Sequence, residues 1–173
     1  LMIEEGVLEN PKVNKIIGQH VSPELDCGVI GMKEGMFMAS ADEIYIDVIG
    51  KGGHAAIPEG RINPLVIASK IITCLYDRFD KVNDTPSVLS IGVIQGGSAG
   101  NIIPEKVSMQ GTFRAMDEDW RAKALQIIEE ICLNTSKEMG GECDLEIRKG
   151  YPFLKNDVPF TEHCFQQATE FMP

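Results

Sequence analysis

Six segments between residues 39 and 150 carry strand or helix periodicity, and their order constrains the fold more than any other feature. Four of them have the two-residue alternation or the apolar run of a strand: residues 44–48, 88–94, 107–114 and 143–148. Two more have apolar residues at spacings of three and four, the pattern of an amphipathic helix. The first helix should begin at Asn63–Pro64, with Asn as N-cap and Pro in the first position. The second should begin at Asp117 and end at Gly140–Gly141.

The order along the chain is strand, helix, strand, strand, helix, strand. All the strands except residues 88–94 have one clearly polar face, so the sheet should carry helices on one side only. Two helices on one face of a four-stranded antiparallel sheet form the ferredoxin-like two-layer sandwich. The sequence therefore predicts an α+β fold of this kind.

The flanking residues lack the regular strand and helix patterns of residues 39–150 and should not fold alone. Residues 1–38 are interrupted by Gly and Pro and contain one segment like the last turns of a helix and two strand-like runs: Leu1–Val7, Val13–Val21 and Cys27–Met32. In residues 151–173, Tyr151–Pro152 and Val158–Pro159 should bracket a turn before a helix at Thr161–Met172. We expect both flanks to be fragments of a neighbouring domain, and the chain to be a piece of a longer protein.

Composition excludes several classes of function. Lys and Arg total 16 against 26 Asp and Glu, a formal charge of −10 that disfavours nucleic acid as a partner. No uncharged apolar run approaches the roughly 20 residues that span a bilayer, so no membrane association is expected. The five cysteines form no C-x-x-C pair, which favours a reducing compartment and a cytoplasmic location.

The three histidines are the first candidates for chemistry. His54 follows glycines in Gly50–Ala55, formally the G-x-G-x-x-A of a dinucleotide site, but the expected helix begins only at Pro64. His20 ends an apolar run, a common place for a metal ligand, although a zinc site needs three or four ligands. His163 is expected to be a surface residue. A nucleotide site is therefore disfavoured, and a metal site would need further ligands.

Two other segments are notable. Gly96–Asn101 joins the second and third strands and reads as a flexible hairpin loop. Arg114 shares the polar face of its strand with Ser108, Gln110 and Thr112, opposite the helices. An Arg held on a strand can present its planar fork to a carboxylate, although a surface ion pair is the simpler interpretation.

Four motifs, in this order, resemble those of one known family: M-A-S-A-D-E, G-K-G-G-H-A-A-I-P, G-G-S-A-G-N-I-I-P and G-T-F-R, at Met38–Glu43, Gly50–Pro58, Gly96–Pro104 and Gly111–Arg114. The sequence is similar to the co-catalytic metallopeptidase-like amidohydrolases, in the branch of aminoacylases, hippurate hydrolases and auxin-conjugate hydrolases. The resemblance implies a fragment of a catalytic domain at residues 1–38, a lid or dimerisation domain at 39–150, and a return into the catalytic domain at 151–173.

The resemblance also implies roles for individual residues. His54 would reach the active site of the partner subunit in a homodimer and stabilise the oxyanion. Asn101 and Arg114 would hold the substrate, a small N-acyl amino acid, and His20 would bind one of two divalent metal ions (zinc, manganese, cobalt or nickel). Glu59 and Asn63 depart from the usual His and Asp of this branch, which leaves the fine substrate preference open.

Two hypotheses follow for the whole protein. The first is a metal-dependent amidohydrolase; because the other metal ligands and the general base have no counterpart here, this chain alone should be inactive. The alternative is a non-catalytic ferredoxin-like assembly or regulatory ligand-binding module, in which His54 is an ordinary loop residue.

Overall fold

The computed structural model describes residues 2–57, 59–80 and 85–172 and divides the chain into two compact units, Leu1–Met32 and Lys33–Pro173. The first unit consists of turns and extended segments, with one isolated bridge between Glu9 and Lys12. Here the sequence-based prediction of secondary structure is wrong. The described part of Leu1–Val7 is a series of turns, and neither Val13–Val21 nor Cys27–Met32 is a strand. Their apolar residues are largely exposed and find no neighbouring strand, and without a partner a strand leaves its backbone groups unpaired.

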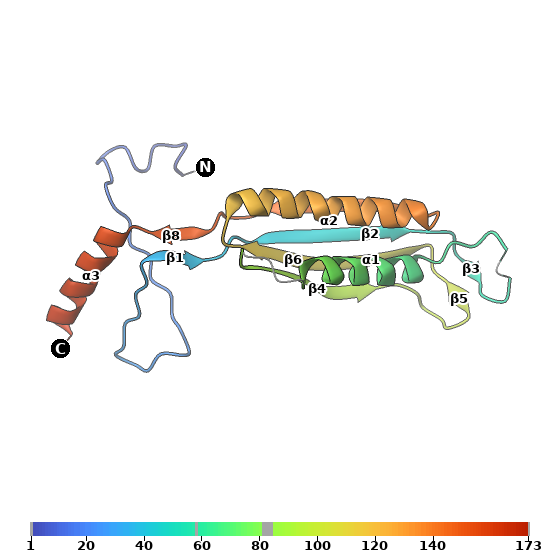
Figure 1. Ribbon diagram of the computed structural model, residues 1–173, viewed down its shortest axis with the longest axis horizontal. Helices are drawn as coiled ribbons and strands as arrows, with labels where there is room; N and C mark the ends of the chain where they lie inside the picture. The colour runs from blue at the N-terminus through green and yellow to red at the C-terminus, as the bar shows by residue number, and fades with distance from the viewer. Residues whose placement is uncertain (1, 58, 81–84, 173) are drawn as a thin grey trace. The chain divides into compact units, whose positions relative to one another are not determined.

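The second unit is built on the predicted four-stranded sheet. Its strands and helices are β2 (Asp42–Ile49), α1 (Pro64–Phe79), β4 (Ser87–Gln95), β6 (Lys106–Ala115), α2 (Glu118–Glu138) and β7 (Glu142–Lys149). The strand order is β4-β6-β2-β7 and every neighbouring pair is antiparallel. Both helices cover the same face of the sheet (Figure 1). The ferredoxin-like α+β sandwich is therefore confirmed.

The core lies between this sheet and the two helices. Ile44, Ile46 and Val48 of β2 point inward and are fully buried, while the residues between them are partly exposed. Phe113 and Met109 fill the same layer from β6, against the inner faces of α1 and α2. Burial of each such side chain stabilises the fold by about 1.5–3 kcal/mol, and the alternation fixes which face of the sheet receives the helices.

The helix ends follow the predicted capping residues. The side chain of Asn63 accepts a hydrogen bond from the backbone N–H of Leu65 (3.0 Å), and Pro64 occupies the first turn. Asp117 caps α2 in the same way, accepting from the N–H of Trp120 (2.7 Å). After α2, Gly140 takes a positive φ of +79°, a conformation that favours glycine and ends the helix.

Two short ribbons were not predicted. β1 (Gly35–Met38) pairs with β8 (Leu154–Asn156), where the sequence indicated only a turn, and β3 (Gly53–His54) pairs with β5 (Ile102–Ile103). The helix that follows, α3 (Val158–Phe171), begins three residues before the predicted Thr161, because Asp157 caps it. None of the helices in the described ranges has the length and apolar character that a membrane crossing requires.

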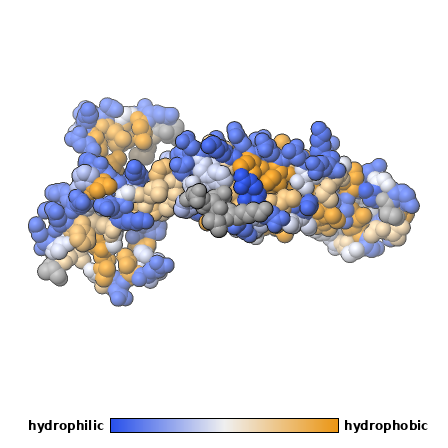
Figure 2. Space-filling view, viewed as in Figure 1, coloured by the Kyte–Doolittle hydropathy of each residue, from blue (hydrophilic) through white to orange (hydrophobic). Residues whose placement is uncertain are grey.

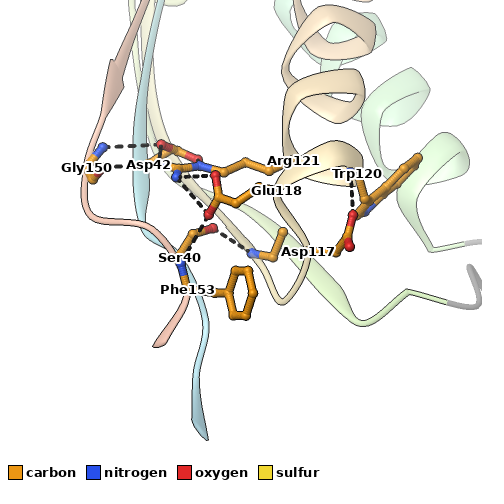
Figure 3. Close-up of polar contacts among 9 residues, drawn as sticks. Ser40, Asp42, Asp117, Glu118, Trp120, Arg121, Gly150 and Phe153 are labelled. Carbon is orange, nitrogen blue, oxygen red and sulfur yellow. Dashed lines mark hydrogen bonds and ion pairs between the residues drawn. The ribbon is translucent and has the colours of Figure 1, made fainter. Parts of the chain in front are cut away.

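A buried ion pair ties the sheet to α2 at the end where the chain enters β2 and leaves β7 (Figure 3). Arg121 donates to both carboxylate oxygens of Asp42, from Nε at 2.8 Å and from Nη2 at 2.6 Å. Arg121 also donates to the Glu118 carboxylate (3.0 Å) and to the carbonyl of Gly150 (3.2 Å). Asp42 and Arg121 are 1% and 6% exposed, so this network joins three segments inside the protein.

Candidate functional site

Two of the predicted site residues, His54 and Asn101, meet at one end of the sheet. His54 lies on β3 and pairs with Ile102 of β5, and the backbone N–H of Ala55 donates to the carbonyl of Asn101 (2.9 Å). Figure 1 shows this ribbon extending beyond the end of the four-stranded sheet. The glycine-rich segment predicted to be a flexible hairpin is thus followed by a short strand that attaches it to the histidine loop.

A local hydrogen bond indicates the tautomer of the neutral His54 ring. The N–H of Ala56 donates to Nδ1 of His54 (3.2 Å), so Nδ1 acts as the acceptor. In the neutral imidazole the proton then resides on Nε2. Because the His54 side chain is exposed, Nε2 is available to donate a hydrogen bond to an atom outside its own chain segment.

An open depression of about 530 Å³ lies beside these loops. Its lining includes the glycine-rich segment Gly96–Gly100, the residues Ile102 and Ile103 of β5, and Asn63 at the start of α1. The glycines carry no side chains into this hollow, which leaves room for a small molecule or a segment of another chain.

Arg114 lies at the opposite end of the sheet from His54. It is exposed on the polar face of β6, as the alternation predicted, and pairs with Val88 of β4. β5 precedes Lys106, the first residue of β6, whereas Arg114 is the ninth of its ten residues. At about 3.3 Å per residue, roughly 25 Å separates Arg114 from the β3–β5 ribbon. One copy of the chain therefore does not bring the two candidate groups together.

His20 lies in the first unit and is exposed. Its Nδ1 donates to the carbonyl of Val21 (2.6 Å), which leaves the Nε2 lone pair free, the usual arrangement of a metal-ligating histidine. However, the residues that the structure describes contain no group of three or more His, Cys, Asp or Glu side chains that could hold a metal ion. His20 therefore has the tautomer of a ligand but not the neighbours, and the chain does not form a metal centre from its described residues.

The two edge strands of the sheet differ in their side chains. β7 carries charged residues along its exposed face, such as Glu146 and Arg148, which discourage pairing with another strand. β4 has no charged residue in its nine positions and exposes Val88 and Ile94. The adjacent helix α1 exposes Val66, and Figure 2 shows apolar surface among polar groups over the helix layer. β4 is thus the edge open to another chain.

One residue beside His54 was missed by the sequence patterns. Arg61 donates from Nη1 to the carbonyl of Gly52 (2.5 Å) and from Nε to the carbonyl of Ile57 (3.4 Å). Nothing in periodicity or motif distinguishes Arg61 from a surface arginine, because its two acceptors are backbone carbonyls. Only the folded loop reveals this contact.

The four-stranded antiparallel sheet with two helices on one face defines the class of this domain, which is an α+β two-layer sandwich. Residues 40–140 match the model of the peptidase dimerisation domain, and the chain therefore belongs to that family, M20. N-acetyl-L-cysteine deacetylase of Bacillus subtilis is 33% identical over 162 residues, 92% of this chain and 38% of the relative. Thermostable carboxypeptidase 2 of Saccharolobus solfataricus is 34% identical over 170 residues, 95% of this chain and 42% of the relative.

A solved structure agrees with this assignment. A dinuclear metal-binding peptidase of the M20 family from Bacillus subtilis superposes with a TM-score of 0.73 at 28% identity, over 98% of this chain and 42% of that one. The chain thus spans about two fifths of the length of the curated relatives that it matches.

Proposed function

We propose that the whole protein is a metal-dependent amidohydrolase that cleaves an N-acyl amino acid or a related small amide. The family membership supports hydrolysis of an amide bond, and one relative is named as the deacetylase of an N-acetyl amino acid. A cytoplasmic location is part of the proposal, supported by five cysteines that are all free thiols.

His54 would supply a hydrogen bond to the oxyanion that forms when the amide carbonyl is attacked. The hydrogen bond from Ala56 to Nδ1 favours the neutral tautomer with its proton on Nε2, and the His54 side chain is exposed. A single oxyanion donor of this kind typically contributes 10²–10³ in kcat. Asn101, which is joined to the His54 loop through its backbone, would contact the same substrate.

Arg114 would recognise the free carboxylate of the substrate. A guanidinium can bind a carboxylate with two parallel hydrogen bonds. An N-acetyl amino acid carries such a carboxylate, and so does the carboxyl-terminal residue removed by a carboxypeptidase, which are the substrates named for the two relatives. Arg114 is exposed on the polar face of β6, where a ligand has access to it.

The observation that carries the proposal is the distance between His54 and Arg114 on one copy of the chain. If two copies pair antiparallel along β4 about a twofold axis, the Ser87 end of one β4 lies beside the Gln95 end of the other. Ser87 is level with Ala115, next to Arg114, and Gln95 is level with Ser108, close to the β3–β5 ribbon. A homodimer of this kind would place Arg114 of one copy near His54 of its partner and so complete the site.

Two divalent metal ions are proposed for the whole protein, by analogy with the dinuclear relative. Bound metals would polarise the amide carbonyl and lower the pKa of a water molecule. Of the described residues only His20 is proposed as a ligand, so the other ligands would lie in the part of the relatives that this chain does not span. This chain itself would contribute binding, dimerisation and the His54 hydrogen bond.

Subunit mixing in the full-length protein tests the proposal. His20→Ala and His54→Ala proteins should each be nearly inactive toward N-acyl amino acids. If His54 acts across the interface, each heterodimer has one site with both residues intact. Random exchange makes about half of the dimers mixed, so roughly a quarter of wild-type activity should return. Differently tagged copies verify that heterodimers form; heterodimers without activity would contradict the shared site.

A different experimental result would favour the alternative, a non-catalytic module. A wild-type full-length protein that is dimeric and metal-loaded, yet inactive toward N-acyl amino acids and small peptides, would favour the non-catalytic assembly or ligand-binding module.

A further inference from the structure

The loop that carries His54 has little secondary structure to hold it. β3 and β5 have two residues each, and a ribbon this short is not stable by itself in water. At the base of the loop, Lys51 and Ile62 exchange backbone hydrogen bonds at 2.8 and 3.2 Å. Between these anchors, the N–H of Ala55 donates to the carbonyl of Asn101 (2.9 Å) and the N–H of Ile57 to that of His54 (3.1 Å), and side-chain contacts add to these bonds.

Arg61 provides these contacts from inside the loop. Its guanidinium donates to the carbonyl of Gly52, two residues before His54, and to the carbonyl of Ile57, three residues after it. Both bonds end on the backbone, so they fix the path of the chain on either side of the histidine. The Arg61 side chain is half-buried, whereas His54 itself is exposed.

Gly53 shows how closely the guanidinium approaches the chain. A Cβ atom built on Gly53 would overlap the Cζ and both Nη atoms of Arg61. Gly53 also has a φ of +144°, which L residues with side chains rarely adopt. Glycine at this position therefore allows the planar group to lie against the backbone directly before His54.

We propose that Arg61 is a positioning residue that holds the His54 loop in the orientation needed for its hydrogen bond to the oxyanion. This inference rests on the function proposed above. A lysine could not replace the arginine, because a single ammonium lacks the rigid planar fork that reaches two carbonyls at once. Arg61 contacts no substrate in this role; it acts through His54.

The test is a double-mutant cycle in the full-length, metal-loaded dimer, with an N-acetyl amino acid as substrate. Arg61→Met keeps an unbranched stem and removes the donors. It should lower kcat at least about tenfold and leave KM within about twofold, because the His54 bond is made in the transition state. In the His54→Ala background, Arg61→Met should lower kcat by less than about twofold, because Arg61 acts through the imidazole that is already missing.

Two controls separate positioning from general damage. Arg148→Met removes an exposed arginine from β7, the edge strand opposite β4, and should leave kcat within about twofold of the wild-type value. Arg61→Lys, the conservative variant, should lose at least about tenfold in kcat with an unchanged thermal midpoint and dimer content. If Arg61→Met does not fold, Arg61→Lys takes its place in the cycle.

The outcomes distinguish this inference from the proposed function. An unchanged kcat in the Arg61 variants, or an equal loss with and without His54, would overturn the positioning role while leaving the function intact. An unchanged kcat in His54→Ala would overturn both.

Discussion

Removing Arg121 should destabilise the chain far more than removing any surface arginine. Arg121→Met preserves the apolar stem but leaves the Asp42 carboxylate, which is 1% exposed, with a hydrogen bond from the N–H of Gly150 (3.2 Å) in place of its ion pair. Two charge-assisted bonds of 2.8 and 2.6 Å are lost at once. Breaking a buried pair by deleting one partner costs about 3–5 kcal/mol, mostly because the other charge stays buried.

The pKa of Arg121 bears on the design of this experiment. The hydrogen bonds that Arg121 donates to Asp42 raise the pKa of the Arg121 guanidinium above its ordinary value, against the opposing effect of burial. A group whose pKa is raised in the folded state contributes its stability at every pH below its unfolded pKa, and loses it only as the pH rises through the still higher folded value. The loss on substitution should therefore arise from removal of the charge and be insensitive to Arg121 titration between pH 6 and 9.

Urea unfolding followed by circular dichroism measures the effect. The midpoint should fall with little change in the slope. A loss of 3–5 kcal/mol corresponds to a melting temperature lower by roughly 6–20 °C for a chain of this size. Asp42→Leu combined with Arg121→Met should recover most of the loss, since an apolar pair leaves no buried charge. A loss below about 1 kcal/mol in Arg121→Met, with Arg148→Met as the exposed control, would refute the reasoning.

Three further predictions follow from the structure. In the full-length protein, Arg114→Ala should lower kcat/KM about ten- to a hundredfold for substrates with a free carboxylate and much less for the corresponding amides; equal losses would contradict carboxylate recognition. Hydrogen bonds from Lys106 and then Ser108 lower the pKa of Asp47, so their stabilisation is present above pH 4 and lost as the pH falls through the folded value; Asp47→Asn should reduce the fall in melting temperature between pH 5 and 3. This chain alone should show no amidase activity with added zinc, manganese or cobalt, because its described residues form no metal centre; measurable turnover would refute that.

The sheet and its two helices could be predicted because each has a signal within its own residues. Alternation in β2 and β6 places Ile44 and Phe113 in the core, and the caps Asn63 and Asp117 define where the helices begin. These signals are local, and the structure satisfies all of them together. Such agreement between local preference and global packing is what allows a sequence pattern to specify a fold.

The short ribbons could not be predicted because they lack such a local signal. A strand of two to four residues, such as β3 or β8, is too short to show a period. Whether it forms depends on a partner distant in the sequence, as for His54 and Ile102. The opposite error occurred at Val13–Val21, where an apolar run has the composition of a strand but pairs with no strand among the described residues of its unit.

The candidate residues could be selected from sequence by residue type, by strand position and by the family motifs, but their arrangement could not be derived. His54 and Asn101 are 47 positions apart yet joined through Ala55, whereas Asn101 and Arg114 are 13 positions apart yet lie toward opposite ends of the sheet. Sequence distance thus gives the wrong order of proximity. Arg61 had no signal of any kind, since its partners are carbonyl groups that every residue has.

The length of β6 supports the proposal that two copies of the chain form the site together. Ten residues of extended strand span about 30 Å, much more than the reach of an arginine and a histidine toward a common small substrate. Two arrangements could place such groups together: a large bend of the sheet, or a second copy turned by a twofold axis. The sheet is continuous, because β2 pairs with β6 over eight successive residues without a register shift. The β4 edge has no charged residue, so it can pair with the β4 strand of a second copy. Antiparallel pairing about a twofold axis would bring the Arg114 end of one sheet beside the His54 end of the other, which favours the second arrangement.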